Sequence, residues 1–177
     1  MSMLEIQHLS TDFETENGMV HAVRDVSLSV DKGEVLGIVG ESGSGKSQTM
    51  FSVMGLLSGN GIVKDGSITI DGNGNSITRS TDGIILNVVY ADGTNVTVQD
   101  LTLAGNNGGG LLQWTMEGSY KENDSPSTTP KLTVKNCTFS SDDGQKTGAG
   151  IGLWGHTSGD WFNAAKSEVV IDGCTFD

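Results

Sequence analysis

The 177-residue sequence has few prolines, cysteines and aromatic side chains, and it has no long apolar run. Two prolines exclude a proline-stiffened linker, and two cysteines cannot define a disulfide framework. No apolar run approaches the length of a membrane span, so direct membrane insertion is not expected. The first ten residues, MSMLEIQHLS, lack the basic and apolar regions of a secretion signal. We therefore expect a cytoplasmic protein.

Positive charge is also scarce. The sequence has 10 lysines and arginines but 22 aspartates and glutamates, which gives a formal net charge of -12. A chain this acidic repels nucleic-acid phosphates and anionic lipid, so we expect no nucleic-acid binding. Glycine is abundant, with 26 residues, which is typical of a turn-rich chain.

One glycine-rich stretch carries a specific chemical pattern. Residues 40–47 read GESGSGKS, which has the spacing G-x-x-x-x-G-K-[ST] of a phosphate-binding loop. The apolar run 34–39 predicts a strand before the loop. An apolar stripe at Met50, Val53, Met54 and Leu57 predicts a helix with one buried face after it.

The residue types of this loop suit phosphate chemistry. Glycines let backbone N–H groups approach phosphate oxygens, and a helix N-terminus adds partial positive charge. Lys46 would reach the β- and γ-phosphates, and Ser47 would offer its hydroxyl to Mg²⁺. The predicted nucleotide contacts in the loop are Gly40, Ser42, Gly43, Ser44, Gly45, Lys46, Ser47 and Gln48.

The sequence pattern changes near Lys64 and Asp65, which divides the chain into residues 1–64 and 65–177. In the first part, residues 4–13 and 21–30 predict two strands joined by a turn at 16–18. In the second part, short alternating apolar clusters repeat. Val96 to Leu132 is 36 residues and Leu132 to Val169 is 37, a period typical of stacked coils.

The second part resembles the right-handed parallel β-helix of pectin-lyase-like proteins over about residues 66–177. The resemblance rests on ITIDGNGNSI, VTVQDLTL, LTVKNCTF and VVIDGCTF. It implies about three coils, with Asp100, Asn136 and Gly173 turning the chain between short strands. The overall expectation is a mixed α/β phosphate-loop segment followed by an all-β solenoid, with the helix at 50–57 capping the first coil.

Residues 1–64 resemble the start of an ABC-type import ATPase of the dipeptide and oligopeptide class. The matching stretches are LEIQHLSTDF, VHAVRDVSLSV, KGEVLGIVGESGSGKS and MGLL. The resemblance implies ATP and Mg²⁺ as ligands and a membrane transporter complex as partner. It also implies that Phe13 stacks on adenine and that Val23 lies beside the base.

Later motifs of that family are absent from the sequence. The apolar run that ends at Asp172 is followed by Gly173, where a catalytic glutamate is needed. LSGNG at 57–61 directly follows the predicted helix, so it is not the family's downstream signature loop. No glutamine or histidine occupies the switch positions. We therefore expect nucleotide binding without hydrolysis, because the metal-holding and water-activating groups are missing.

Two other interpretations stay open. The chain could be a non-enzymatic surface or carbohydrate-associated β-helix protein, with aromatic rings for stacking on sugars, or an artificial or misassembled join near residues 65–72. The candidate sugar-binding side chains are Trp114, Trp154, Trp161 and His156.

The repeat also makes a prediction about the cysteines. Cys137 and Cys174 occupy equivalent positions in successive copies, so we expect stacked, buried free thiols. The alignment places a second stack of Leu103, Phe139 and Phe176 beside them.

Overall fold

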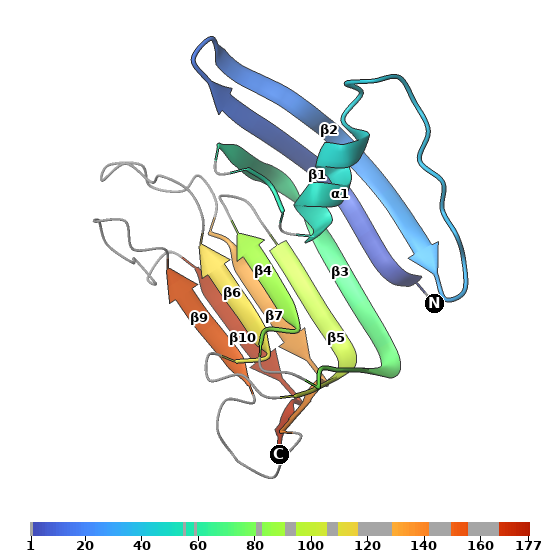
Figure 1. Ribbon diagram of the computed structural model, residues 1–177, viewed down its shortest axis with the longest axis vertical. Coiled ribbons are helices and arrows are strands. Elements are labelled where there is room, and N and C mark those ends of the chain that lie inside the picture. The colour runs from blue at the N-terminus through green and yellow to red at the C-terminus, as the bar shows by residue number, and fades with distance from the viewer. Residues whose placement is uncertain are drawn as a thin grey trace.

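A computed structural model describes residues 2–54, 56–58, 60–80, 83–90, 95–105, 110–116, 129–141, 150–155 and 167–177. These residues are mostly β-strand and form mixed sheet, with one described helix (Figure 1). The elements are β1 (Ser2–Thr15), β2 (Gly18–Asp31), α1 (Lys46–Met54), β3 (Gly61–Thr78), β4 (Leu86–Tyr90), β5 (Asn95–Ala104), β6 (Leu112–Met116), β7 (Lys131–Lys135), β8 (Thr138–Ser140), β9 (Ile151–Gly155), β10 (Glu168–Asp172) and β11 (Thr175–Phe176).

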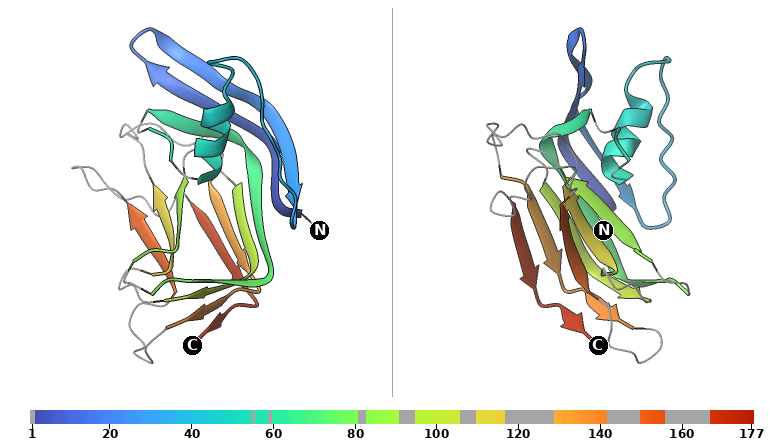
Figure 2. Two further views of the ribbon diagram at one scale, coloured as in Figure 1. Left: turned by 45° about the vertical axis from the view of Figure 1, so that its right-hand side comes forward. Right: turned by 60° about the vertical axis from the view of Figure 1, so that its left-hand side comes forward.

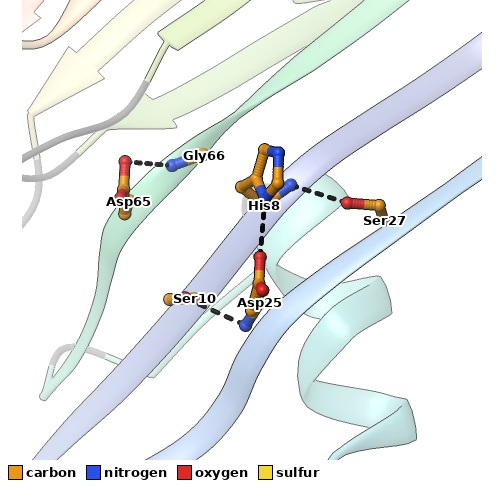
Figure 3. Close-up of polar contacts among 6 residues, drawn as sticks. All are labelled: His8, Ser10, Asp25, Ser27, Asp65 and Gly66. Carbon is orange, nitrogen blue, oxygen red and sulfur yellow. Dashed lines mark hydrogen bonds and ion pairs between the residues drawn. The ribbon is translucent and has the colours of Figure 1, made fainter.

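The first two strands form a long antiparallel hairpin, which confirms the two strands predicted at 4–13 and 21–30. Two bulged residues face each other across it, His8 with φ 55° and Asp25 with φ 50°. His8 Nδ1 lies 2.6 Å from Asp25 Oδ1. The His8 amide donates to Ser27 Oγ, and the Asp25 amide donates to Ser10 Oγ (Figure 3). These bonds hold a bulge that locally twists the hairpin.

Strand β3 connects the hairpin to the rest of the sheet. It pairs antiparallel with β1, from Phe13 beside Gly61 to Leu4 beside Ile70. It also pairs parallel with β5. The strand order in the larger sheet is β10-β7-β5-β3-β1-β2 (Figure 1). Because β3 is continuous through residues 64 and 65, the change of sequence pattern falls inside one strand.

The repeated clusters pair in parallel and in the register predicted from their alignment. Val96 of β5 lies beside Leu132 of β7, which lies beside Val169 of β10. The shorter strands β8 and β11 pair in the same way, beside the second part of β5. The intervening clusters form a second sheet, β4-β6-β9, which faces the first (Figure 2).

One hydrophobic core runs between these layers and under the hairpin. Its inward side chains alternate with outward polar ones along each strand, as in β5, where Val96, Val98, Leu101 and Leu103 are buried. The predicted stack of Leu103, Phe139 and Phe176 is confirmed by the register, and the rings of the two phenylalanines stack with centroids 5.0 Å apart.

Helix α1 differs from its sequence prediction in length and in its buried face. It ends at Met54, and its buried residues are Thr49 and Ser52, whereas Met54 is 51% exposed. Both hydroxyls are satisfied within the helix, because Thr49 Oγ1 donates to Gly45 O and Ser52 Oγ donates to Gln48 O. Thr11 Oγ1 of β1 lies 2.8 Å from Ser52 Oγ, which fixes the helix to the hairpin.

The helix packs mainly on β1 and β2, against one face of the hairpin (Figure 2). The prediction that the helix at 50–57 caps the first coil is therefore wrong, because α1 lies on the hairpin. The physical reason is that β1 already occupies the free edge of β3 through an antiparallel ladder. Within the described ranges, no helix has the length and apolar character needed to cross a membrane.

The prediction of a strand at 34–39 is also wrong. This segment has no ladder partner among the described residues, and Val35 and Val39 are 95% and 92% exposed. An apolar strand of this kind needs neighbours on both edges to be buried. The described strands pair without a gap from β10 to β2, so no position with two neighbouring strands is left for 34–39, which runs outside the sheet.

The two cysteines are free and stack as predicted, but only Cys137 is buried, and Cys174 is partly exposed. Burial raises the pKa of the Cys137 thiol, and the nearby Cys174 raises it further. Because the thiolate is the reactive form, a raised pKa slows alkylation at neutral pH.

We therefore expect iodoacetamide to modify Cys174 in the native protein and Cys137 only after unfolding or at higher pH. Peptide mass spectrometry of timed samples would measure both rates. The variant Cys174→Ser should leave the native protein unmodified at early times. Equal labelling of both thiols would contradict the burial of Cys137.

Candidate functional site

The glycine-rich loop lies between the exposed segment 34–39 and the start of α1 at Lys46. Two of its glycines have left-handed backbones, Gly43 with φ 81° and Gly45 with φ 87°. A Cβ at Gly45 would overlap the carbonyl oxygen of Ala22 on β2, whereas a Cβ at Gly43 would meet nothing within 4 Å. Gly45 therefore lets the start of α1 rest directly on the hairpin.

The ammonium of Lys46 lies at the centre of this loop. Its Nζ donates to Gly40 O at 2.9 Å, to Glu41 O at 2.5 Å and to Ser44 Oγ at 3.0 Å. The loop thus curls around a cation by means of backbone and hydroxyl oxygens. Phosphate oxygens are stronger acceptors for an ammonium than these neutral oxygens. A phosphate bound at this position would replace these neutral oxygens as the acceptor of the Lys46 hydrogen bonds.

The start of α1 adds a second electrostatic feature. The first turn holds no acidic side chain that would neutralise the positive end of the helix dipole. The first intrahelical bond runs from Thr49 N to Gly45 O at 2.8 Å. The amides before Thr49 are those that a helix leaves without an intrahelical acceptor. Ser47 is exposed beside them, and Gln48 is half-buried.

The structure brings the predicted residues 40–48 together in one loop and helix start. Val23 lies beneath this site, since it is 3% exposed and its side chain lies under Gly45. Phe13 is half-buried on β1, where it lies opposite Val20 and its ring packs against Gly61. Val23 therefore supports the loop from the core side, and Phe13 lies at the other end of α1, near the helix-following Leu57.

The residues considered for other functions lie elsewhere. Trp114 is 1% exposed inside the core, so its ring cannot stack on a surface sugar. Trp161 and His156 lie outside the described residues, and so does the side chain of Trp154. Asp172 is exposed on β10, at the far end of the sheet from β2.

Sequence reasoning did not single out a polar pocket of about 480 Å³ along the turns between strands. The sequence feature that could have indicated this pocket is the turn position shared by Asp100 and Asn136 in successive repeats. The φ values of both residues are 51°. Asn136 Nδ2 donates to Asp100 Oδ1 at 3.1 Å, so these side chains tie successive turns together. In the described part of the chain, no group of three or more His, Cys, Asp or Glu side chains could hold a metal ion. The pocket is lined by Asp71, Asn73, Gly74, Asp100, Leu101, Thr102, Asn136 and Thr138.

Comparisons with known proteins bear on the glycine-rich loop. The oligopeptide transport ATP-binding protein OppD of Escherichia coli is 52% identical over 71 residues, which cover 40% of this chain and 21% of that protein. OppD of Haemophilus influenzae is 50% identical over 66 residues, 37% of this chain and 20% of the relative. The dipeptide transport ATP-binding protein DppD of Escherichia coli is 39% identical over 92 residues, 52% of this chain and 28% of the relative.

The matched part of the chain thus spans between 20% and 28% of the length of these curated relatives. No solved structure matches. The family model described as ABC transporter matches residues 23–137, which include the whole glycine-rich loop and α1 and continue through β7. This match covers well over half of the 177 residues. The chain belongs to the ABC transporter family.

Proposed function

We propose that the chain binds the phosphates of ATP, together with Mg²⁺, at residues 40–48, and that it does so weakly. The observation that carries the proposal is the position of Lys46, whose ammonium lies inside a glycine loop at the start of a helix. The amides of the loop and helix start would receive phosphate oxygens, as at other helix N-termini. Ser47, exposed beside Lys46, would supply a hydroxyl ligand to Mg²⁺.

The base would depend on fewer contacts. Phe13 is the aromatic side chain that we assign to adenine stacking on the family resemblance, although its partly buried ring packs against Gly61 at the other end of α1. Val23 is buried under Gly45, so its contribution is to hold the loop in place. With one ring and one loop as contacts, the affinity should be low.

The wider role follows from the relatives, whose printed names are oligopeptide and dipeptide transport ATP-binding proteins. We infer a nucleotide-binding role in a peptide-import assembly, on the cytoplasmic face of a membrane and with a membrane transporter complex as partner. Hydrolysis is not expected, because the sequence has no Asp-Glu pair after an apolar strand and no signature loop.

We also infer two segments within the single sheet, a nucleotide-binding segment of residues 1–64 and a repeat segment of residues 65–177. The parallel, in-register stacking of β3, β5, β7 and β10, with a second stack of β4, β6 and β9, supports a right-handed parallel β-helix of about three coils for the repeat segment.

Titration of the full chain with ATP, with and without Mg²⁺, tests the nucleotide site. We expect a Kd on the order of 0.1–1 mM, which corresponds to about −4 to −5.5 kcal/mol. Lys46→Ala should abolish binding because it removes the ammonium at the centre of the loop. Lys32→Ala, at an exposed position before the loop, should bind as the parent does.

Isothermal titration calorimetry would measure these affinities. No binding at several millimolar ATP, or equal losses in the two lysine variants, would contradict the proposed site. Phosphate release that depends on Lys46 would contradict the expected lack of hydrolysis.

A further inference from the structure

The last strands of the stacks expose side chains whose counterparts one strand earlier are buried. Each of these positions points inward by register, and no strand of the described ranges lies beyond β9, β10 or β11 to cover it. The exposed fraction rises from 0% at Val134 to 50% at Ile171, from 0% at Phe139 to 51% at Phe176, and from 1% at Trp114 to 53% at Leu153.

The backbone of β10 is open on the same side. β10 is the terminal strand of the sheet order, with β7 as its ladder partner in the described part of the chain. Glu168 N donates to Pro130 O, and Asn136 N donates to Asp172 O, each at 2.8 Å. Residues 168 and 172 therefore direct their backbone groups toward β7. By alternation, Val169 and Ile171 direct their N–H and C=O groups toward the open edge.

The charges along this edge are complementary to lysine. Glu168 Oε1 lies 3.0 Å from Lys131 Nζ of β7, and Asp172 lies beside Lys135 in the register. The two carboxylates are exposed and each has a lysine on one side only among the described strands. The other side of β10 presents the same two carboxylates at the same spacing to any strand that pairs there.

We propose that the open edge of β10 and β11 binds a basic, extended strand–turn–strand segment of a partner polypeptide in parallel orientation. The segment would carry lysine or arginine beside Glu168 and Asp172, and apolar side chains over Val169, Ile171 and Phe176. Residues 131–140 are a model for such a segment, because they pair in parallel with the opposite edge of β10 and β11. They place Lys131 beside Glu168 and the ring of Phe139 on that of Phe176.

A second copy of the chain fits this edge poorly. Two copies of β10 paired antiparallel about Val170 would place Glu168 of one copy beside Asp172 of the other. Like charges directly opposite each other destabilise a strand pair. Each chain also carries a formal charge of -12. The electrostatics therefore favour a basic partner over self-association.

The test uses the full chain and a fluorescent peptide with the sequence of residues 131–140, in which Cys137→Val removes the thiol. The matched control peptide carries Lys131→Glu and Lys135→Glu. Fluorescence anisotropy should show saturable binding of the first peptide, weakened by salt. The control should bind at least about tenfold more weakly, because two attractive pairs become two repulsive ones.

Two protein variants place the binding at this edge. Ile171→Pro removes an amide that faces the open edge and leaves the bonds to β7 in place. It should abolish peptide binding while the circular dichroism spectrum stays that of the parent. If this variant does not fold, Phe176→Asp, at a half-exposed terminal position, should weaken binding at least tenfold by placing a charge over the apolar contact.

Equal affinity for the two peptides, absence of binding, or binding unchanged in the folded variants would overturn the proposal. A peptide-free dimer detected by light scattering that Ile171→Pro dissociates would also overturn it, because the edge would then serve a second copy.

Discussion

Gly45→Ala should destabilise the protein far more than Gly43→Ala and should abolish ATP binding. Both glycines have left-handed backbones, a conformation that costs alanine about 1–2 kcal/mol. Only at Gly45 does the added methyl overlap the carbonyl oxygen of Ala22. Relieving such an overlap adds about 1–3 kcal/mol, because β2 or the start of α1 must shift.

Urea denaturation of both variants would measure this difference, and ATP titration would measure its effect on the site. Gly43→Ala is the matched control, since its φ is within a few degrees of that of Gly45 and its Cβ would point into open space. Equal free energies of unfolding for the two variants would show that α1 does not rest on β2 as described.

Phe139→Ala should cause one of the largest losses of stability among single truncations in the repeat segment. Phe139 is fully buried, and its ring stacks on Phe176 with an interplanar angle of 6°. Replacing a buried phenylalanine by alanine costs about 3–5 kcal/mol through lost burial and a residual cavity. That loss is a large share of the roughly 5–15 kcal/mol that stabilises a typical domain.

Phe176→Ala is the control, because it removes the same side chain from a half-exposed position. Its loss should be about 1–2 kcal/mol, in proportion to the smaller apolar area removed from water. Thermal and urea denaturation followed by circular dichroism would give both values. A smaller loss of unfolding free energy for Phe139→Ala than for Phe176→Ala would contradict the finding that Phe139 is the more buried of the two rings.

The sequence predicted the parts of the fold that depend on local repetition. Leu103, Phe139 and Phe176 recur at one position of a copied pattern, and stacking them places similar side chains over one another. The hairpin was predicted for a similar reason, since two apolar runs flank a short turn at residues 16–18. The loop at 40–47 was predicted because the spacing of its glycines, lysine and serine matches the pattern of a phosphate-binding loop.

The parts that failed depend on which elements become neighbours. An apolar run at 34–39 becomes a buried strand only if two other strands flank it, and the described strands pair without a gap from β10 to β2. The helix was assigned an apolar buried face, yet Val53 and Leu57 are only partly buried against the core, while its fully buried side chains are Thr49 and Ser52. Their hydroxyls bond within the helix, which removes the usual penalty for burying them. Periodicity of hydrophobicity cannot reveal that compensation.

The ladder between β1 and β3 has a consequence for folding during synthesis. It joins Leu4 to Ile70, whereas the hairpin that contains β1 is complete when Asp31 has been made. A growing chain can therefore form the hairpin early, with one edge of β1 still open. Open edges promote pairing with other chains. Until β3 has left the ribosome, the nascent hairpin would be the segment most in need of a chaperone.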